Sequence, residues 1–145
     1  MIGIDAHTVV PDADVAAAWY ARAFGAVEES RVPLPGGGVL SVVLRFGGSR
    51  VHVAGELPEF GFVSPLTIGG TATVLQINTD DADALWSRAL EAGAEVHHEI
   101  SDQFWGERHG QLTDPFGHRW NIAQRLREVP ADEIAAAAGL MFATR

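Results

Sequence analysis

An internal repeat constrains the fold of this chain more than any other feature of its sequence. Residues 2–10 predict a strand, and the helix pattern that follows has Asp12 as its N-cap and Gly25 at the left-handed position after its end. Further strand-like runs follow near residues 28–32, 40–46 and 50–54, with glycine-rich turns between them. The first part of the chain therefore predicts one strand, one helix and three more strands.

The second half repeats this order. Residues 73–79 predict a strand, and a helix then begins at Asp80 or Asp81 and ends before Gly93. Further strands are expected near residues 95–100, 107–113 and 118–124. The separation of Asp80 from Gly93 is 13 residues, the same as that of Asp12 from Gly25. We therefore predict a βαβββ unit that occurs twice, the alternative being a chance likeness of two alanine-rich helices.

These patterns predict an α+β fold in a single domain over residues 1–145. Module one covers about residues 2–54, and module two about residues 73–127. Between them, about residues 55–72 are rich in glycine and proline and predict a linker, which could instead act as a flap. A short C-terminal helix is expected at about residues 130–139, where it would serve in packing.

Composition excludes several classes of function. A hydrophobic content of 47% is sufficient for a buried core. The formal net charge of -9 argues against nucleic acid or an anionic membrane surface as a partner, because both require a basic face. Cysteine is absent, which excludes disulfides and thiolate chemistry. No apolar run is long enough to span a bilayer, so we expect a soluble, cytoplasmic protein.

Strand alternation sorts side chains onto two faces. Val51 and Val53 define the apolar face of one strand, so His52 lies on the opposite face. Applied to four strands, with Ile2, Ile4 and Ala6 on the core side of the first, this rule predicts a mostly polar second face. The residues on that face are Asp5, His7, His52, Val74, Gln76 and Asn121. If the two sheets curve together, these residues line a cup; the alternative is a plain water-facing surface.

A tight turn near the end of the chain fixes the register of the last two strands. The run Asp114-Pro115-Phe116-Gly117 has the residues of a type I turn, with Asp at its start, Pro in its second place and Gly at its end. Because a one-residue slip moves every side chain to the other face, this turn identifies Asn121 as the inward-facing residue.

The repeat together with this hairpin resembles the vicinal oxygen chelate superfamily, which includes glyoxalase I, extradiol dioxygenases and bleomycin-resistance proteins. The likeness is carried by the segments 18–26, 106–110 and 114–120. More narrowly, the chain resembles the single-domain subgroup described as phosphonate-operon-like or demethylubiquinone-methyltransferase-like, a description that does not imply methyl transfer. The resemblance implies two βαβββ modules whose paired curved sheets form a cup, usually completed in a homodimer.

Metal-using members of this superfamily carry one ligand on the first and one on the last strand of each module. The resemblance places these four positions at Asp5 or His7, His52, Val74 and Asn121. Only the first two positions offer good ligands, whereas a divalent site of this type needs three. Gln76 or His7 could substitute if the register shifts by two residues. We therefore expect no cofactor, with a divalent metal as the alternative.

Three residues in or beside the hairpin are further candidates for the site or its support. Arg108 could bind a carboxylate or phosphate of a ligand, or could form an ion pair that anchors the hairpin. Trp105 could stack on a flat ligand. His118 follows the turn directly, and a structural hydrogen bond is favoured for it over a catalytic role.

The hypothesis we favour is a protein that binds a small, partly aromatic or hydrophobic molecule in the cup, without a complete metal site. Its expected ligand-binding residues are Asp5, His7, His52, Gln76, Trp105, Arg108 and Asn121; no catalytic residue is assigned. One alternative is a divalent-metal-dependent lyase, isomerase or dioxygenase. Another is a metal-free enzyme of secondary metabolism with His52 or Asp5 as general base.

Overall fold

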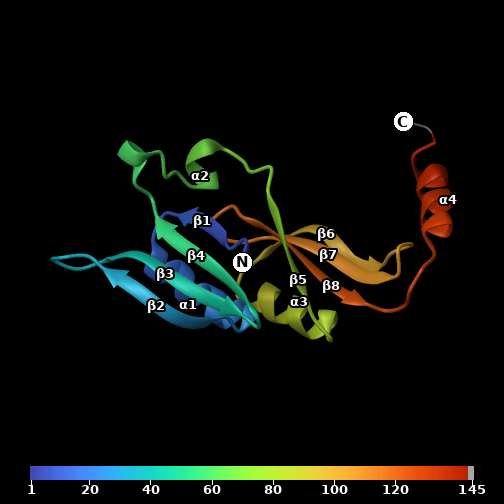
Figure 1. Ribbon diagram of the computed structural model, residues 1–145, viewed down its shortest axis with the longest axis horizontal. Helices are drawn as coiled ribbons and strands as arrows, with labels where there is room; N and C mark the ends of the chain where they lie inside the picture. The colour runs from blue at the N-terminus through green and yellow to red at the C-terminus, as the bar shows by residue number, and fades with distance from the viewer. Residues whose placement is uncertain (144–145) are drawn as a thin grey trace.

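The computed structural model describes residues 1–143 and contains two four-stranded sheets, each with one helix against it (Figure 1). The first module consists of β1 (Ala6–Val10), α1 (Ala13–Phe24), β2 (Val27–Pro33), β3 (Val39–Phe46) and β4 (Ser49–Gly55). The second consists of β5 (Val74–Asn78), α3 (Ala82–Glu91), β6 (Glu95–Asp102), β7 (Glu107–Thr113) and β8 (Arg119–Arg125). The prediction of a repeated βαβββ unit is therefore confirmed.

The two sheets have equivalent topologies. Their strand orders are β1-β4-β3-β2 and β5-β8-β7-β6. The first strand of each module pairs in parallel with the last, while all other pairs are antiparallel. This arrangement leaves β1 and β5 at sheet edges, so the first strands of both modules present unpaired backbone groups on one side.

The helices begin and end where the capping residues predict. The Asp12 carboxylate accepts hydrogen bonds from the backbone of α1, and Gly25 ends that helix with a φ of 71°. In the second module, Asp81 and not Asp80 is the N-cap, and Gly93 has a φ of 105° directly after the helix. The separation between N-cap and glycine is therefore one residue shorter in the second module than the 13 residues of the first.

The core lies between the helices and one face of each sheet. Alternate side chains of the strands, such as Val42, Val53 and Ile122, are fully buried there. The two modules meet through α1 and α3, which lie side by side (Figure 1). The indole of Trp19 on α1 donates a hydrogen bond of 2.7 Å to the carbonyl of Ala92 just after α3, and so joins the two helices.

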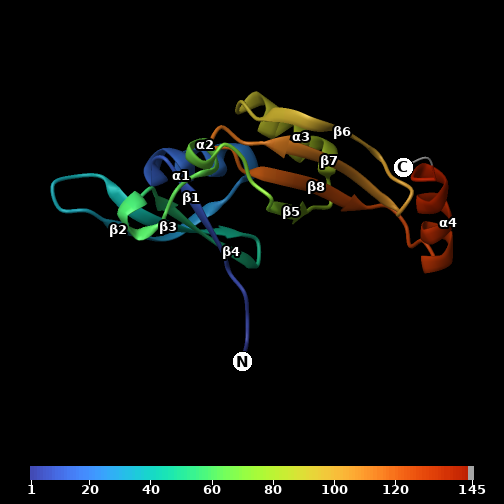
Figure 2. The ribbon, with the colours of Figure 1, turned by 90° about the horizontal axis from the view of Figure 1, so that it is seen from above.

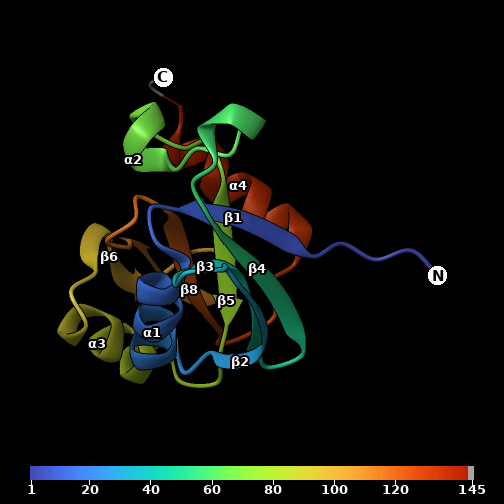
Figure 3. The same ribbon diagram turned by 90° about the vertical axis from the view of Figure 1, so that its left-hand side faces the viewer.

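The first strand is shorter than the sequence predicts. Residues 1–5 do not belong to β1 but extend away from the sheet (Figures 2 and 3). Ile2 and Ile4 are 98% and 95% exposed, so the expectation that both lie on the core face is wrong. The pairing of β1 with β4 begins at Ala6, opposite Val51, and the residues before Ala6 are not paired into the sheet.

The connection between the modules carries short helical segments in place of a plain linker. It contains a 3₁₀ turn, η1 (Pro58–Phe60), and one helical turn, α2 (Pro65–Ile68). Both begin with a proline, a residue that is common in the first turn of helices. The carboxylate of Glu56 accepts hydrogen bonds from the Ser64 amide at 2.8 Å and from the Thr67 hydroxyl at 2.5 Å, which ties the segment into a compact loop.

The C-terminal helix, α4 (Ala131–Met141), stands apart from the rest of the fold (Figure 1). None of its residues is buried against the described part of the chain, and Leu140 is 83% exposed. The packing role expected for this helix therefore has no buried contact to support it within residues 1–143. In residues 1–143, no helix has the length and apolar character needed to cross a membrane.

Candidate ligand-binding site

Strand register brings four of the expected site residues into two equivalent pairs. His7 on β1 lies opposite His52 on β4, and Gln76 on β5 lies opposite Asn121 on β8. The two pairs occupy the same places in the two modules, on the sheet face that the helices do not cover. The register also places Val74 opposite Arg119, so Gln76 and not Val74 lies directly opposite Asn121.

The first pair forms a small aromatic and acidic group. The rings of His7 and His52 are stacked with their centroids 5.7 Å apart, and the ring of Phe62 lies 6.0 Å from that of His7. Nε2 of His52 lies 3.1 Å from a carboxylate oxygen of Asp5, within hydrogen-bonding distance. Asp5, His7 and His52, which the sequence predicts as one set, are therefore adjacent.

The second pair belongs to a chain of carboxamides. The amide nitrogen of Asn121 donates to the side-chain oxygen of Gln76 at 3.4 Å, and Gln76 donates in turn to Asn78 at 3.0 Å. On the other side, Gln111 donates to the oxygen of Asn121 at 2.9 Å. These side chains satisfy one another and supply neutral donors and acceptors instead of charge.

This donor set does not fit the divalent site of metal-using relatives. The first pair supplies two imidazoles, but the second supplies only amide oxygens, which are weak ligands compared with carboxylates. Within residues 1–143, no three His, Cys, Asp or Glu side chains are grouped so that they could hold a metal ion.

A groove of about 1410 Å³ lies between the two modules, at the edge strands β1 and β5. Asp5, His7 and Gln76 line it, whereas His52 and Asn121 lie one strand further into their sheets. Apolar side chains from several elements complete the lining: Phe46, Val63, Ile68, Leu75, Ile77 and Trp120. The groove therefore combines a nonpolar surface with a few polar groups, as small-molecule sites do.

Trp105 lies outside this groove. Its indole nitrogen donates to Glu107 at 2.5 Å, and its ring contacts that of His109 edge-on at 5.4 Å. Both Trp105 and Ile134 of α4 line a second cavity of about 680 Å³ at the far end of β8. Trp105 is thus not adjacent to the other expected site residues.

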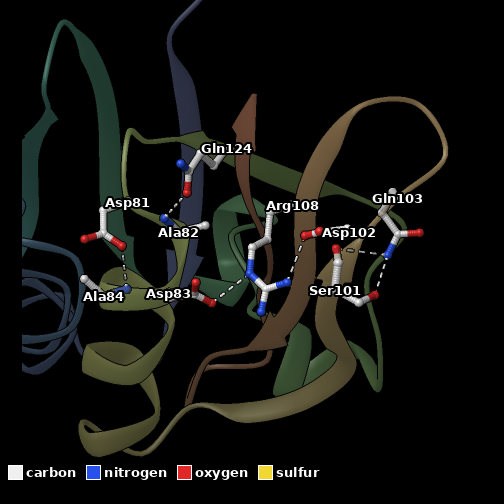
Figure 4. A network of polar contacts seen from close by, with 9 residues as sticks. All are labelled: Asp81, Ala82, Asp83, Ala84, Ser101, Asp102, Gln103, Arg108 and Gln124. Atoms are coloured by element: carbon white, nitrogen blue, oxygen red, sulfur yellow. Dashed lines mark hydrogen bonds and ion pairs between the residues drawn. The ribbon is translucent and has the colours of Figure 1, made fainter. Parts of the chain in front are cut away.

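Arg108 takes part in an ion-pair network (Figure 4). Its guanidinium lies 2.8 Å from Asp83 at the start of α3 and 2.9 Å from Asp102 at the end of β6. The hydrogen bonds that Arg108 donates to Asp83 and then to Asp102 raise the pKa of Arg108 above its usual value. Arg108 thus joins α3 to the β6–β7 hairpin, as the anchoring interpretation expects. Because two of its nitrogens are paired with carboxylates, no pair of N–H groups is left to bind a ligand.

His118 connects the modules. Its Nε2 lies 2.7 Å from the carbonyl oxygen of Val9 on β1, although it also lines the groove. A structural hydrogen bond is thus observed, but with a residue of the other module.

Arg119 is a groove residue that the sequence analysis left unassigned. It directly follows His118 on β8 and lies opposite Val74. The same alternation that placed Asn121 on the inward face places Arg119 there, so the signal was present in the sequence.

Comparisons with known proteins agree with this architecture. The sequence model described as the Glyoxalase/Bleomycin resistance protein/Dioxygenase superfamily matches residues 6–122. An uncharacterized protein of Mycobacterium tuberculosis (strain ATCC 25618 / H37Rv) is 42% identical over 134 residues, which cover 90% of this chain and 79% of the relative.

Solved structures share the fold. The crystal structure of an Arabidopsis thaliana gene product has a TM-score of 0.67 and 29% identity, with 85% of this chain and 98% of that chain covered. The bleomycin resistance determinant encoded on the transposon Tn5 has a TM-score of 0.62 and 19% identity, with 86% and 98% covered. At that identity, the second likeness shows the fold alone.

Proposed function

The chain belongs to the glyoxalase/bleomycin resistance protein/dioxygenase superfamily, and on this premise we propose that it binds a small, partly aromatic or hydrophobic molecule without a complete metal site. The ligand occupies the groove between β1 and β5. Asp5, His7 and Gln76 contact it directly, and His52 and Asn121 support them from the neighbouring strands.

One observation carries the proposal: the two equivalent residue pairs differ in chemistry. His7 and His52 could ligate a divalent ion, but Gln76 and Asn121 at the corresponding places offer only carboxamides. A binding site keeps its use when its charged ligands are replaced by amides, because amides still donate and accept hydrogen bonds. A metal site of this family does not, since it needs three strong donors.

The lining of the groove supports a ligand with a flat apolar part. The partly exposed ring of Phe46 lines the groove and stacks on the buried Trp120, with 5.4 Å between ring centroids. Burial of nonpolar ligand surface against such side chains supplies most of the affinity in small-molecule sites. The volume of about 1410 Å³ exceeds the roughly 300–1,000 Å³ of typical ligand pockets, which leaves space for a second protein surface.

We further propose that a second copy of the chain completes the site as a homodimer. The sheet faces that carry His52 and Asn121 are not covered by the chain's own helices. Large nonpolar side chains are exposed on the N-terminal arm and on α4, among them Ile2, Ile4 and Leu140. We propose these exposed nonpolar side chains as candidate contacts of the partner copy.

Ligand-induced stabilisation tests the binding proposal. We expect a library of aromatic compounds to contain members that raise the melting temperature of the wild type, since a ligand of the folded state stabilises it by mass action. Filling the groove with Gln76→Trp should abolish the increase. Stabilisation that is unchanged in Gln76→Trp would place the ligand elsewhere and contradict the proposal.

Metal content tests the proposal that the chain lacks a complete metal site. Protein purified without chelators should hold zinc, nickel, manganese and iron well below one ion per chain by elemental analysis. Stoichiometric metal that disappears in His52→Ala would instead support the metal-dependent enzyme.

A second candidate function rests on the Asp5–His52 contact of 3.1 Å. A carboxylate beside an imidazole can orient it as a general base, as a metal-free enzyme would require. Under this alternative, His52→Gln would still bind the ligand but would no longer convert it, a result that mass spectrometry of the bound compound can distinguish from simple binding.

A further inference from the structure

The charge of the groove is opposite to that of the whole chain. The sequence holds 19 acidic and 10 basic residues, for a formal net charge of -9. The described residues that line the groove include three arginines, Arg45, Arg50 and Arg119, but only one carboxylate, that of Asp5. A cationic cavity in an acidic protein concentrates anions locally while the rest of the surface repels them.

Two of the three arginines already have a partner. Arg50 forms a two-pronged contact with the carboxylate of Glu29, with both N–O distances at 2.8 Å, and Arg45 approaches the same carboxylate at 3.7 Å. Two guanidinium groups thus share one carboxylate. With Asp5 nearby, the charges on this side of the groove balance, so Arg45 and Arg50 offer no unpaired positive charge.

The third arginine is available. In the part of the chain that the structure describes, the side chain of Arg119 makes no hydrogen bond and no ion pair with a carboxylate. Its charge acts instead on His97, whose pKa is lowered by desolvation and then by the Arg119 guanidinium. Arg119 is half-buried, so an anion that reached it would be partly shielded from water and salt.

We propose that the groove recognises a ligand that carries an anionic group, a carboxylate, sulfonate or phosphate, and that Arg119 binds this group. This inference rests on the proposed function, because it names the chemical class of the molecule that occupies the same groove. The planar guanidinium of Arg119 offers paired N–H donors that match the oxygens of such a group. The nonpolar part of the ligand would lie against other side chains that line the groove, such as Val63 and Ile68.

Two fluorescent probes of similar shape separate charge from nonpolar contact. The first is 1-anilinonaphthalene-8-sulfonate, and the second is N-phenyl-1-naphthylamine, which lacks the sulfonate. We expect Arg119→Gln to weaken binding of the sulfonate probe about tenfold, since a charge-assisted hydrogen bond is lost, and to leave the neutral probe within about twofold. Arg119→Lys should be intermediate. The matched control Arg22→Gln removes an exposed charge of α1 and should change neither probe.

The groove-filling variant Gln76→Trp distinguishes failure of this inference from failure of the proposed function. In one outcome, Gln76→Trp abolishes binding of both probes, while Arg119→Gln affects both probes equally or affects neither. The groove then binds ligands but Arg119 does not select anions, so the inference is overturned and the proposed function is not. If both probes bind Gln76→Trp as well as the wild type, or neither binds the wild type, the groove is not the site and both proposals fall.

Discussion

At the scale of single residues, one buried carboxylate joins the two modules. Oδ2 of Asp114, in the turn between β7 and β8, accepts hydrogen bonds from the Tyr20 hydroxyl on α1 at 2.5 Å and from the Trp120 indole at 2.8 Å. Its other oxygen accepts from the backbone amides of Phe116 and His118. The turn-forming aspartate of the sequence thus has a second role that only the fold reveals.

Removal of one partner should cost stability. We expect Tyr20→Phe to lower the free energy of unfolding by about 1–2 kcal/mol, because it removes a buried hydrogen bond to a charged acceptor while it keeps the aromatic contacts. Urea denaturation measures the change. In an Asp114→Asn background the same substitution should cost clearly less, and equal costs in both backgrounds would show that Tyr20 and Asp114 are not coupled.

The single tyrosine of the chain makes its ionisation directly visible. Burial, and then the charge of Asp114, raise the pKa of Tyr20 well above its usual value. Because the folded state favours the neutral phenol, the stability it contributes is complete below the unfolded pKa of about 10 and is lost as pH rises through the folded-state pKa. We expect no phenolate absorbance at 295 nm near pH 10 in the folded protein, whereas in 8 M urea half of the tyrosine should be ionised there. Ordinary titration in the folded state would contradict the buried contact.

The sequence pattern predicted part of the candidate site, but it missed the parts that depend on contacts between residues far apart in the chain. Alternation beside a sharp turn correctly placed Asn121 on the inward face. It could not choose between Val74 and Gln76, because that choice depends on how β5 pairs with a strand 45 residues away. It also could not assign Arg108 to Asp83, which lies 25 residues before it and comes near only through packing of α3.

At the scale of elements, helix α3 requires a glycine in β7. A Cβ on Gly110 would lie 2.5 Å from the Trp86 ring and 2.9 Å from the Cα of Ile100. We expect Gly110→Ala to lower the free energy of unfolding by about 1–3 kcal/mol through overpacking. Gly48→Ala is the matched control, since a Cβ there meets no atom within 4 Å. Equal melting temperatures of the two variants would show that Trp86 moves aside without cost.

The loop between the modules depends on an ionised carboxylate. Hydrogen bonds from Ser64 and then from Thr67 lower the pKa of Glu56. The contribution of Glu56 is therefore present above its unfolded pKa of about 4.3 and is lost as pH falls through the folded-state value. We expect the Ser64 amide to lose hydrogen-exchange protection over that acidic range, and Glu56→Gln to lower protection already at pH 7. Glu59→Gln, a surface change in the same loop, should leave protection unchanged; an equal loss there would contradict the role of Glu56.

Capping residues predicted the helices well, because a cap is a local interaction between neighbours. The start of β1 was predicted less well: the alternation of Ile2, Ile4 and Ala6 indicates a strand, yet the pairing with β4 begins only at Ala6, and alternation alone does not show where pairing starts. The isolated helix α4 shows the same limit, since its alanine-rich sequence gives no indication of what it packs against.

At the scale of the whole molecule, the exposed ends of the chain make the homodimer testable. We expect light scattering to give twice the 15.5 kDa mass of the chain, with dissociation on dilution. Leu140→Asp should shift the equilibrium toward the monomer, because it places a charge in the nonpolar contact of α4. Ala135→Asp changes another exposed residue of the same helix, well away from Leu140 around its axis, and should leave the mass unchanged. A wild type that stays monomeric at high concentration would refute the dimer, and equal effects of the two variants would exclude Leu140 as its contact.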